Sequence, residues 1–334
     1  DNLCSNNSYY FAPIIGTNPC GETCLEAWGV CNLGSLVLKH FVSGSRIQWK
    51  KLEEVIHLAI RFLDSCIDVN LYTLPEVKIT AQRGRRVGLG VMGLADMFLG
   101  LGVRYGSRES LDVAERLFKF IRNVSYEASI KLAIEKGTFP AFEPTPYCKA
   151  KFIRTLPPSL RQSIRKHGTR NVTLMAMAPT GTISLVPECS GGIEPIPYLA
   201  YKRKDYVSER FYIHPAYKEA LLSGKAKADY LVDSTDLRPI DHIEIQSVIQ
   251  RYTDGAVSKT IYIAEDESLL SLSDVLLESI SDLKGVTVYR DGSREGQPLV
   301  PLSIDEALKV VRNEKDVQVA DADTLVCASG KCEI

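Results

Sequence analysis

Asn18-Pro19-Cys20-Gly21-Glu22 is followed, eleven residues after its cysteine, by Cys31-Asn32-Leu33-Gly34-Ser35. Residues 1–38 around these motifs mix Asn, Gly, Pro and Cys, which predicts a loop that enters a short strand. In an extended segment alternate side chains face the same way, so Asn18, Cys20 and Glu22 would project into one pocket. There a carboxylate can act as a general base and an amide can bind a substrate hydroxyl. The alternative is a turn around a buried structural thiol, a common role of free cysteine.

Two further features extend this cysteine chemistry. Residues 32–35 predict a turn that places Cys31 on a strand beside Cys20, although alone Cys31 would be interpreted as structural. The polar segment 314–334 predicts a flexible tail, and its Cys327 and Cys332 are close enough to form a disulfide. A structural zinc would need four ligands, and only these two lie nearby, so we predict no metal site. An inner cysteine and an outer dithiol indicate a two-electron redox enzyme.

Apolar patterns along the chain predict a mixture of helices and strands. Helical spacing or helix start and stop signals occur at 49–72, 107–137, 239–252 and 303–313. Short apolar runs bounded by turn residues predict strands at 172–178, 258–263 and 285–289. The Pro-rich segment 140–158 predicts a connection between helices.

The run Ala178-Pro179-Thr180-Gly181-Thr182-Ile183-Ser184 follows a predicted strand and is rich in small hydroxyl residues. If a helix starts there, its free N–H groups and the hydroxyls make an anion site suited to phosphate. The alternative is an ordinary helix cap. The following Ser190-Gly191-Gly192-Ile193-Glu194-Pro195 predicts a tight loop, where the backbone approaches a ligand or another strand.

Residues 88–93 contain a glycine motif found in nucleotide-binding proteins. Gly88-Leu89-Gly90-Val91-Met92-Gly93 matches the G-x-G-x-x-G pattern of dinucleotide sites, which needs a preceding apolar strand. Residues 82–86, Gln-Arg-Gly-Arg-Arg, do not predict a strand. We therefore interpret the glycines as positions of close helix packing and exclude an NAD site.

The bulk composition is that of a globular protein. The chain has 334 residues, 45% of them hydrophobic, and a net charge of -1, which gives no reason to expect nucleic-acid binding. The most apolar stretch, residues 87–103, is Gly-rich and too short for a membrane span. Nine cysteines without a signal peptide predict reduced thiols and a cytoplasmic location.

Taken together, these segments resemble the catalytic subunit of ribonucleotide reductases. The resemblance implies an α/β fold, namely the second half of the family's ten-stranded α/β barrel, over residues 1–313, followed by a redox-active tail at 314–334. The matching runs occur in the family's order at 18–22, 31–35, 88–96, 178–184, 190–195, 258–261 and 289–293, with the tail match at 327–334.

The resemblance also implies a role for each motif. Cys20 would carry a thiyl radical, Glu22 would act as general base, and Asn18 would bind the substrate, a ribonucleoside di- or triphosphate. Cys31 would be one of two thiols that reduce the 2′ position. Cys327 and Cys332 would then reduce the resulting disulfide and be recharged by thioredoxin or glutaredoxin. The substrate phosphates would be held by Thr180, Gly181, Thr182, Ile183 and Ser184.

Cofactor and partners follow from the same resemblance. The iron-dependent class uses two adjacent tyrosines, whereas Val288-Tyr289-Arg290-Asp291-Gly292-Ser293 is similar to the adenosylcobalamin-dependent class, so we expect that cofactor. The tail also resembles that of the iron-dependent class, whose large subunit needs a radical-generating small subunit. The disulfide partner of Cys31 belongs to the first half-barrel. We therefore expect this chain to need an N-terminal half and to form a homo-oligomer once complete; a non-catalytic scaffold half is the remaining alternative.

Overall fold

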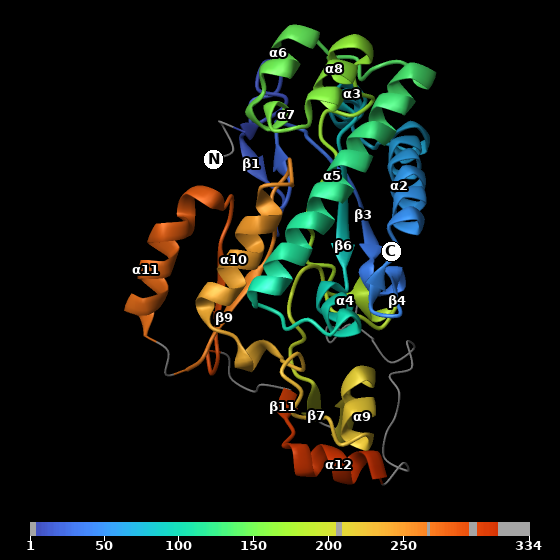
Figure 1. The fold of residues 1–334 in the computed structure, drawn as a ribbon. Coiled ribbons are helices and arrows are strands. Elements are labelled where there is room, and N and C mark those ends of the chain that lie inside the picture. Colours follow the sequence, from blue (N-terminus) through green and yellow to red (C-terminus); the bar gives the residue numbers. More distant parts are fainter. Residues whose placement is uncertain (1–4, 205–208, 266–267, 294–298, 313–334) are drawn as a thin grey trace.

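A parallel sheet forms the centre of the computed structural model, which describes residues 5–204, 209–265, 268–293 and 299–312 (Figure 1). Strand β3 (Asn32–Val37) pairs in parallel with β6 (Val87–Met92). Isolated parallel bridges join Leu89 to Met175 and Met177 to Val257. Strand β9 (Thr260–Ile263), just beyond Val257, pairs in parallel with β10 (Thr287–Arg290). In the described residues these segments run from β3 to β10 without closing into a barrel, and the mixture of helices and strands confirms an α/β fold.

Strand β6 corrects our interpretation of the glycine motif, because Gly88 and Gly90 lie in a strand and not at a helix contact. Every residue of β6 is buried, so the strand lacks the polar alternation that identifies half-exposed strands. A Cβ atom at Gly90 would lie 2.5 Å from the carbonyl oxygen of Ala176. The glycines therefore allow the neighbouring backbone to approach β6 closely.

The helices that cover this sheet are those with clear sequence signals. Helix α2 (Trp49–Val69) packs on β3, β6 and α5 (Arg108–Lys136), and α10 (Pro239–Gln250) packs on α5 and β9, as Figure 1 shows. The Ser107 hydroxyl accepts a hydrogen bond from the Ser110 amide at 3.2 Å, and Gly137 follows the last residue of α5 with φ +85°. These bounds confirm the predicted helices at 49–72, 107–137 and 239–252.

Two local predictions differ from the structure. The Pro-rich segment contains α6 (Pro144–Lys149) and α7 (Lys151–Arg154) and leads into α8 (Pro158–His167), so it is not a plain connection. Proline is well tolerated in the first turn of a helix, and α6 and α8 both begin with one. Residues 172–177 are buried as predicted, but they contribute only the two isolated bridges and no regular strand.

A second sheet lies at the opposite end of the described structure from α8 (Figure 1). It is antiparallel, in the order β11 (Leu299–Pro301), β7 (Ala200–Lys204) and β8 (Glu209–Ile213). Helices α9 (Pro215–Leu222) and α12 (Ile304–Arg312) pack together beside it, and α12 confirms the predicted helix at 303–313 over its described part. Apart from the N-terminal hairpin described below, the remaining elements are α3 (Pro75–Gly84), α4 (Leu94–Leu101), α11 (Leu269–Ser279), β4 (Val42–Ser43), β5 (Arg46–Ile47), η1 (Leu38–Phe41), η2 (Ile183–Leu185), η3 (Ser234–Asp236) and η4 (Ile280–Asp282).

Among the described helices, none combines the length and the apolar composition that a membrane crossing requires. The predicted redox tail, with Cys327 and Cys332, lies outside the described residues.

Candidate functional site

The Asn18–Glu22 motif lies at the tip of a hairpin formed by β1 (Gly16–Thr17) and β2 (Cys24–Leu25). The Gly21 amide donates to the Asn18 carbonyl at 3.0 Å, and the Thr23 amide donates to Asn18 Oδ1 at 2.9 Å. Gly21 has φ +78°, which suits glycine and not a side-chain-bearing residue. The segment is therefore a turn, and the alternation expected for an extended chain does not apply to it.

The turn places the two reactive side chains in different environments. Cys20 is exposed at the tip. Glu22 is only 2% exposed, and its Oε2 atom has no hydrogen-bond partner. The carbonyl oxygen of Glu22 accepts a hydrogen bond from the Ala256 amide at 2.8 Å, which ties the hairpin to the segment before β9. Most buried polar atoms have a hydrogen-bond partner, so this carboxylate oxygen needs an explanation, and a catalytic role is one.

Glu22 and Cys31 meet at one small cavity of about 20 Å³, which is room for about one water molecule. Neither Asn18 nor Cys20 lines it. Burial raises the pKa of Cys31 to about 12, while the positive charge of Arg86 opposes that rise. Cys31 is therefore a protonated thiol at neutral pH. The full lining is Asn6, Ile14, Glu22, Thr23, Cys24, Cys31, Arg86, Val87, Thr173, Met175, Ala176 and Gly255.

Cys31 immediately precedes β3, because residues 32–35 form the start of that strand and not the predicted turn. The parallel pairing of β3 with β6 places Leu33 opposite Gly88. A Cβ atom at Gly88 would lie 3.1 Å from Cys31 Sγ. The absence of a side chain at Gly88 thus makes room for the thiol.

Arg86 and Cys24 are residues of this site that the sequence did not identify. The Arg86 guanidinium donates to Glu26 Oε2 at 2.9 Å, Ser8 Oγ at 3.2 Å and Thr173 Oγ1 at 3.3 Å. These contacts fix a positive charge at the cavity wall. Burial raises the pKa of Cys24, and the charges of Lys284 and Arg86 oppose that rise. The only sequence signal for Cys24 is its position two residues after Glu22.

The predicted phosphate loop begins at Thr180, which has φ +52° and is buried. No α-helix starts there: the Ser184 amide makes one α-helix-like bond to the Thr180 carbonyl at 2.9 Å, but only the short 3-10 helix η2 follows. The expected helix N-terminus is therefore absent from this loop. Gly181, Thr182 and Ile183 are exposed, whereas Ser184 is buried.

The glycine loop beside it confirms the predicted close backbone approach. A Cβ atom at Gly191 would lie 2.8 Å from the Pro179 carbonyl oxygen, and one at Gly192 would lie 2.8 Å from that of Ala178. The Gly192 amide also donates to Thr180 Oγ1 at 2.7 Å. The two loops therefore form one packed unit.

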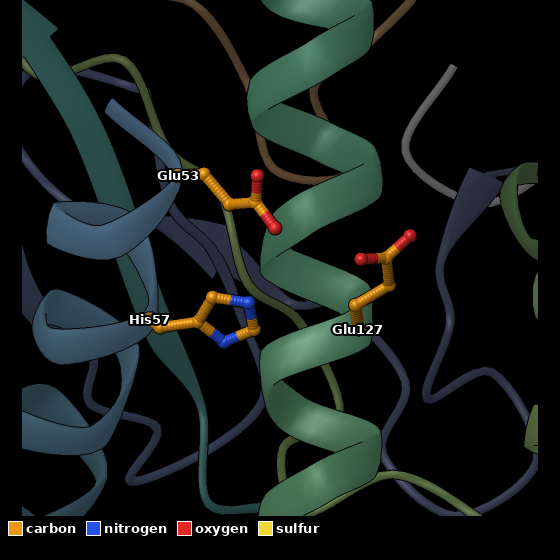
Figure 2. A group of neighbouring side chains, drawn as sticks. All are labelled: Glu53, His57 and Glu127. Carbon is orange, nitrogen blue, oxygen red and sulfur yellow. The ribbon is translucent and has the colours of Figure 1, made fainter. Parts of the chain in front are cut away.

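Figure 2 shows a possible metal-ligand group away from this site: Glu53 and His57, one turn apart on α2, face Glu127 on α5. Their ligand atoms lie within 4.8 Å of one another. Lys131 Nζ, however, lies 3.4 Å from His57 Nε2, and burial together with this ammonium lowers the pKa of His57. The lysine already supplies positive charge to the group, so we assign no metal to it.

Comparison with known proteins gives consistent matches. Residues 2–289 match the family described as "Ribonucleotide reductase, barrel domain". The chain is 32% identical over 345 residues to the vitamin B12-dependent ribonucleoside-diphosphate reductase of Mycobacterium tuberculosis (strain CDC 1551 / Oshkosh), covering 96% of this chain and 46% of that protein. The corresponding Thermoplasma acidophilum protein is 33% identical over 356 residues, with 96% and 44% covered.

A relative that is not named as B12-dependent matches less of the chain. The ribonucleoside-diphosphate reductase subunit alpha of Treponema pallidum is 30% identical over 254 residues, covering 74% of this chain and 29% of that protein. The chain thus spans about half the length of the first two relatives.

Proposed function

Because this chain belongs to the ribonucleotide reductase family, we propose that it forms the C-terminal half of a catalytic barrel that reduces ribonucleotides to 2′-deoxyribonucleotides. One observation carries the proposal. Glu22 and Cys31 line the same cavity, and Glu22 belongs to the hairpin turn that exposes Cys20. This arrangement supports the assignment of a base, a reducing thiol and a radical thiol to one local structure.

Each group has a distinct task in this proposal. A thiyl radical at Cys20 removes the hydrogen atom from C3′ of the ribose, and Glu22 accepts the proton of the 3′-hydroxyl. Glu22 Oε2 supports that role, since no described protein group competes for it. Asn18 Oδ1 accepts from the Thr23 amide, so contact with the substrate falls to its amide NH₂ group.

Cys31 supplies one of the two reducing equivalents. The C2′–O bond breaks, the oxygen leaves as water, and Cys31 and a second thiol are oxidised to a disulfide. Cys20 then returns its hydrogen atom to C3′ and regains the radical. The raised pKa of Cys31 supports this step, because a protonated thiol can donate hydrogen. The second thiol is expected from the N-terminal half, and Cys327 with Cys332 would regenerate the pair with electrons from thioredoxin or glutaredoxin.

The substrate phosphates are assigned to residues 180–184. The exposed residues Gly181, Thr182 and Ile183 offer backbone N–H groups at an accessible turn, and Thr180 and Ser184 fix its two ends. Successive backbone N–H groups in a turn can hold an anion without a helix dipole. This support replaces the helix start that the sequence suggested.

We further propose adenosylcobalamin as the radical source. When bound, this cofactor supplies the radical equivalent that converts the Cys20 thiol to a thiyl. Cys20 fits the requirement, because a bulky cofactor can approach an exposed thiol at a hairpin tip but not a buried one. The names of the two relatives that cover 96% of the chain support the same choice.

Reconstitution tests the proposal. The chain is combined with the N-terminal half of a B12-dependent relative, and reduction of cytidine diphosphate is measured with a dithiol reductant. We expect activity that requires added adenosylcobalamin and disappears in Cys20→Ser, while nucleotide binding persists. Activity only with a metal-containing second subunit would overturn the cofactor assignment. Activity of the chain alone would overturn the requirement for the other half.

A further inference from the structure

We propose that the ion pair between the buried Lys259 and the partly buried Glu194 holds residues 180–194, which contain the predicted phosphate loop and the glycine loop, against the central sheet. This inference rests on the proposed function, because it gives that loop its substrate contact. Neither residue is a catalytic residue, since their side chains bond to protein groups. The pair instead sets where the backbone of the loop lies.

The contacts of Lys259 are unusually complete for a buried lysine. It is 2% exposed, and its ammonium lies 2.8 Å from Glu194 Oε2, 3.0 Å from His242 Nδ1 and 3.2 Å from the Thr260 carbonyl oxygen. These three acceptors match the three donors of an ammonium. Burial lowers the pKa of Lys259, while the charge of Glu194 opposes that shift.

Glu194 links this lysine to the sheet as well. Its Oε1 atom accepts a hydrogen bond from the Thr260 amide at 2.6 Å, at the first residue of β9. Both carboxylate oxygens of Glu194 therefore bind residues 259–260. The loop residue before it is held too, because the Tyr105 hydroxyl donates to the Ile193 carbonyl at 2.6 Å. The end of the loop is thus fixed to β9 and to the segment after α4.

Hydrogen bonds connect the backbone at Glu194 to the predicted phosphate-binding turn. The Glu194 amide closes a turn with the Gly191 carbonyl at 2.9 Å, and the Gly192 amide bonds Thr180 Oγ1 at 2.7 Å. Gly191 and Gly192 also pack against the carbonyls of residues 178–179 without room for a side chain. A displacement of Glu194 therefore moves the contacts that hold Thr180, which has φ +52°.

Stability alone is a weak explanation for such a pair, because desolvation offsets much of the attraction between buried charges. In some proteins a buried polar contact instead fixes one geometry. Here the fixed geometry is that of a loop whose exposed N–H groups would bind phosphate. The test must therefore separate the position of the loop from the stability of the fold.

The variants are Lys259→Met, which leaves Glu194 unpaired, and the double variant Lys259→Met/Glu194→Gln, which removes both charges and keeps similar volumes. Asp64→Asn is the matched control, because Asp64 makes a buried ion pair with Arg85 at 2.8 Å between α2 and the end of α3. Amide hydrogen exchange of each unliganded chain gives the first measurement. We expect the exchange rate of residues 180–194 to rise about tenfold in the double variant. In the control, the ratio of this rate to that of α5 should stay at its wild-type value.

The second measurement is the affinity of the chain, assembled with an N-terminal half, for cytidine diphosphate and inorganic pyrophosphate. We expect the double variant to weaken both by about tenfold, the scale of one lost hydrogen bond to a charged oxygen. In turnover, KM should rise while kcat changes little. Unchanged exchange in 180–194 would overturn the proposal, and so would a loosened loop with unchanged phosphate affinity. The double variant could loosen residues 180–194 while the wild-type assembly binds no nucleotide. That result would support positioning of the loop by the ion pair and would count against the proposed function.

Discussion

Gly88→Ala tests the contact on which the cavity depends, because it adds one methyl group between β6, β3 and the Cys31 thiol. The new Cβ atom would lie 2.6 Å from Leu33 Cδ2, 2.9 Å from Ala176 Cβ and 3.1 Å from Cys31 Sγ. Leu33 is 43% exposed, so its terminal methyl group can rotate away. Ala176 is 2% exposed and offers no such freedom, because its Cβ is fixed to buried backbone.

The expected cost follows from these three contacts. Overpacking of a buried site costs about 1–3 kcal/mol, and replacing glycine lowers the entropy of the unfolded chain by an equivalent of about 0.4–1 kcal/mol. We therefore expect Gly88→Ala to lower the free energy of unfolding by about 1–2 kcal/mol. Gly90→Ala should cost more, about 3 kcal/mol, since its Cβ would lie 2.5 Å from the immobile carbonyl oxygen of Ala176.

Urea unfolding followed by circular dichroism measures this order. Gly285→Ala is the control, because a Cβ there meets nothing within 4 Å, and it should change stability by less than about 0.5 kcal/mol. The order of loss should be Gly90, then Gly88, then Gly285. A Gly88→Ala chain as stable as the Gly285→Ala chain would refute the packing of β6 against Cys31 and Ala176.

The remaining predictions concern single side chains. Burial raises the pKa of Cys31 to about 12, so Cys31 should react with iodoacetamide at pH 8 about 1000-fold more slowly than an ordinary exposed cysteine. Peptide mass spectrometry measures the labelling of each cysteine. Equal labelling of Cys20 and Cys31 would contradict this expectation. Glu22→Gln should reduce ribonucleotide reduction by the reconstituted enzyme at least about 100-fold without loss of stability, since Glu22 Oε2 has no partner to lose; a large drop in melting temperature would count against that reasoning. For Asp96, burial raises the pKa, but hydrogen bonds from His214 and the Ser190 amide outweigh burial and lower the pKa overall. The ionised carboxylate therefore stabilises the fold above its unfolded pKa of about 4. This stabilisation is lost as the pH falls through the lower folded pKa. Asp96→Asn should therefore destabilise at pH 7 and converge with the wild type in acid, and a constant difference down to pH 3 would exclude this linkage.

The positions of α2, α5, α10 and α12 were predictable because their signals are local. Ser107 caps α5 and Gly137 ends it, and both signals can be read within a few residues of the helix ends. Strand β6 was not predictable in the same way. It is buried on both faces and contains two glycines, so neither polar alternation nor β-branched content identifies it. Its pairing with β3 joins residues more than 50 positions apart in the sequence.

In the candidate site too, local features were predictable from the sequence and long-range contacts were not. The motif around Cys20 and Glu22 was visible in the sequence, but its turn geometry depends on Gly21 and on Asn18 Oδ1 accepting a hydrogen bond from the Thr23 amide. Arg86 was missed because a buried arginine cannot be told from a surface one without its partners. Two of those partners, Ser8 and Thr173, lie 78 and 87 residues away.

The position of Cys31 defines where its proposed reducing partner must lie. Cys31 immediately precedes β3, and in the described residues β3 pairs only with β6, so the other edge of β3 is free to accept a strand. A strand added at that edge would place side chains beside the start of β3, where Cys31 lies. Among the described residues, Cys24 lines the same cavity and is the thiol that could compete. Peptide mapping after one turnover of the reconstituted enzyme distinguishes them: a disulfide from Cys31 to the N-terminal half supports the half-barrel assignment, whereas a Cys24–Cys31 disulfide would mean that this chain holds its own reducing pair.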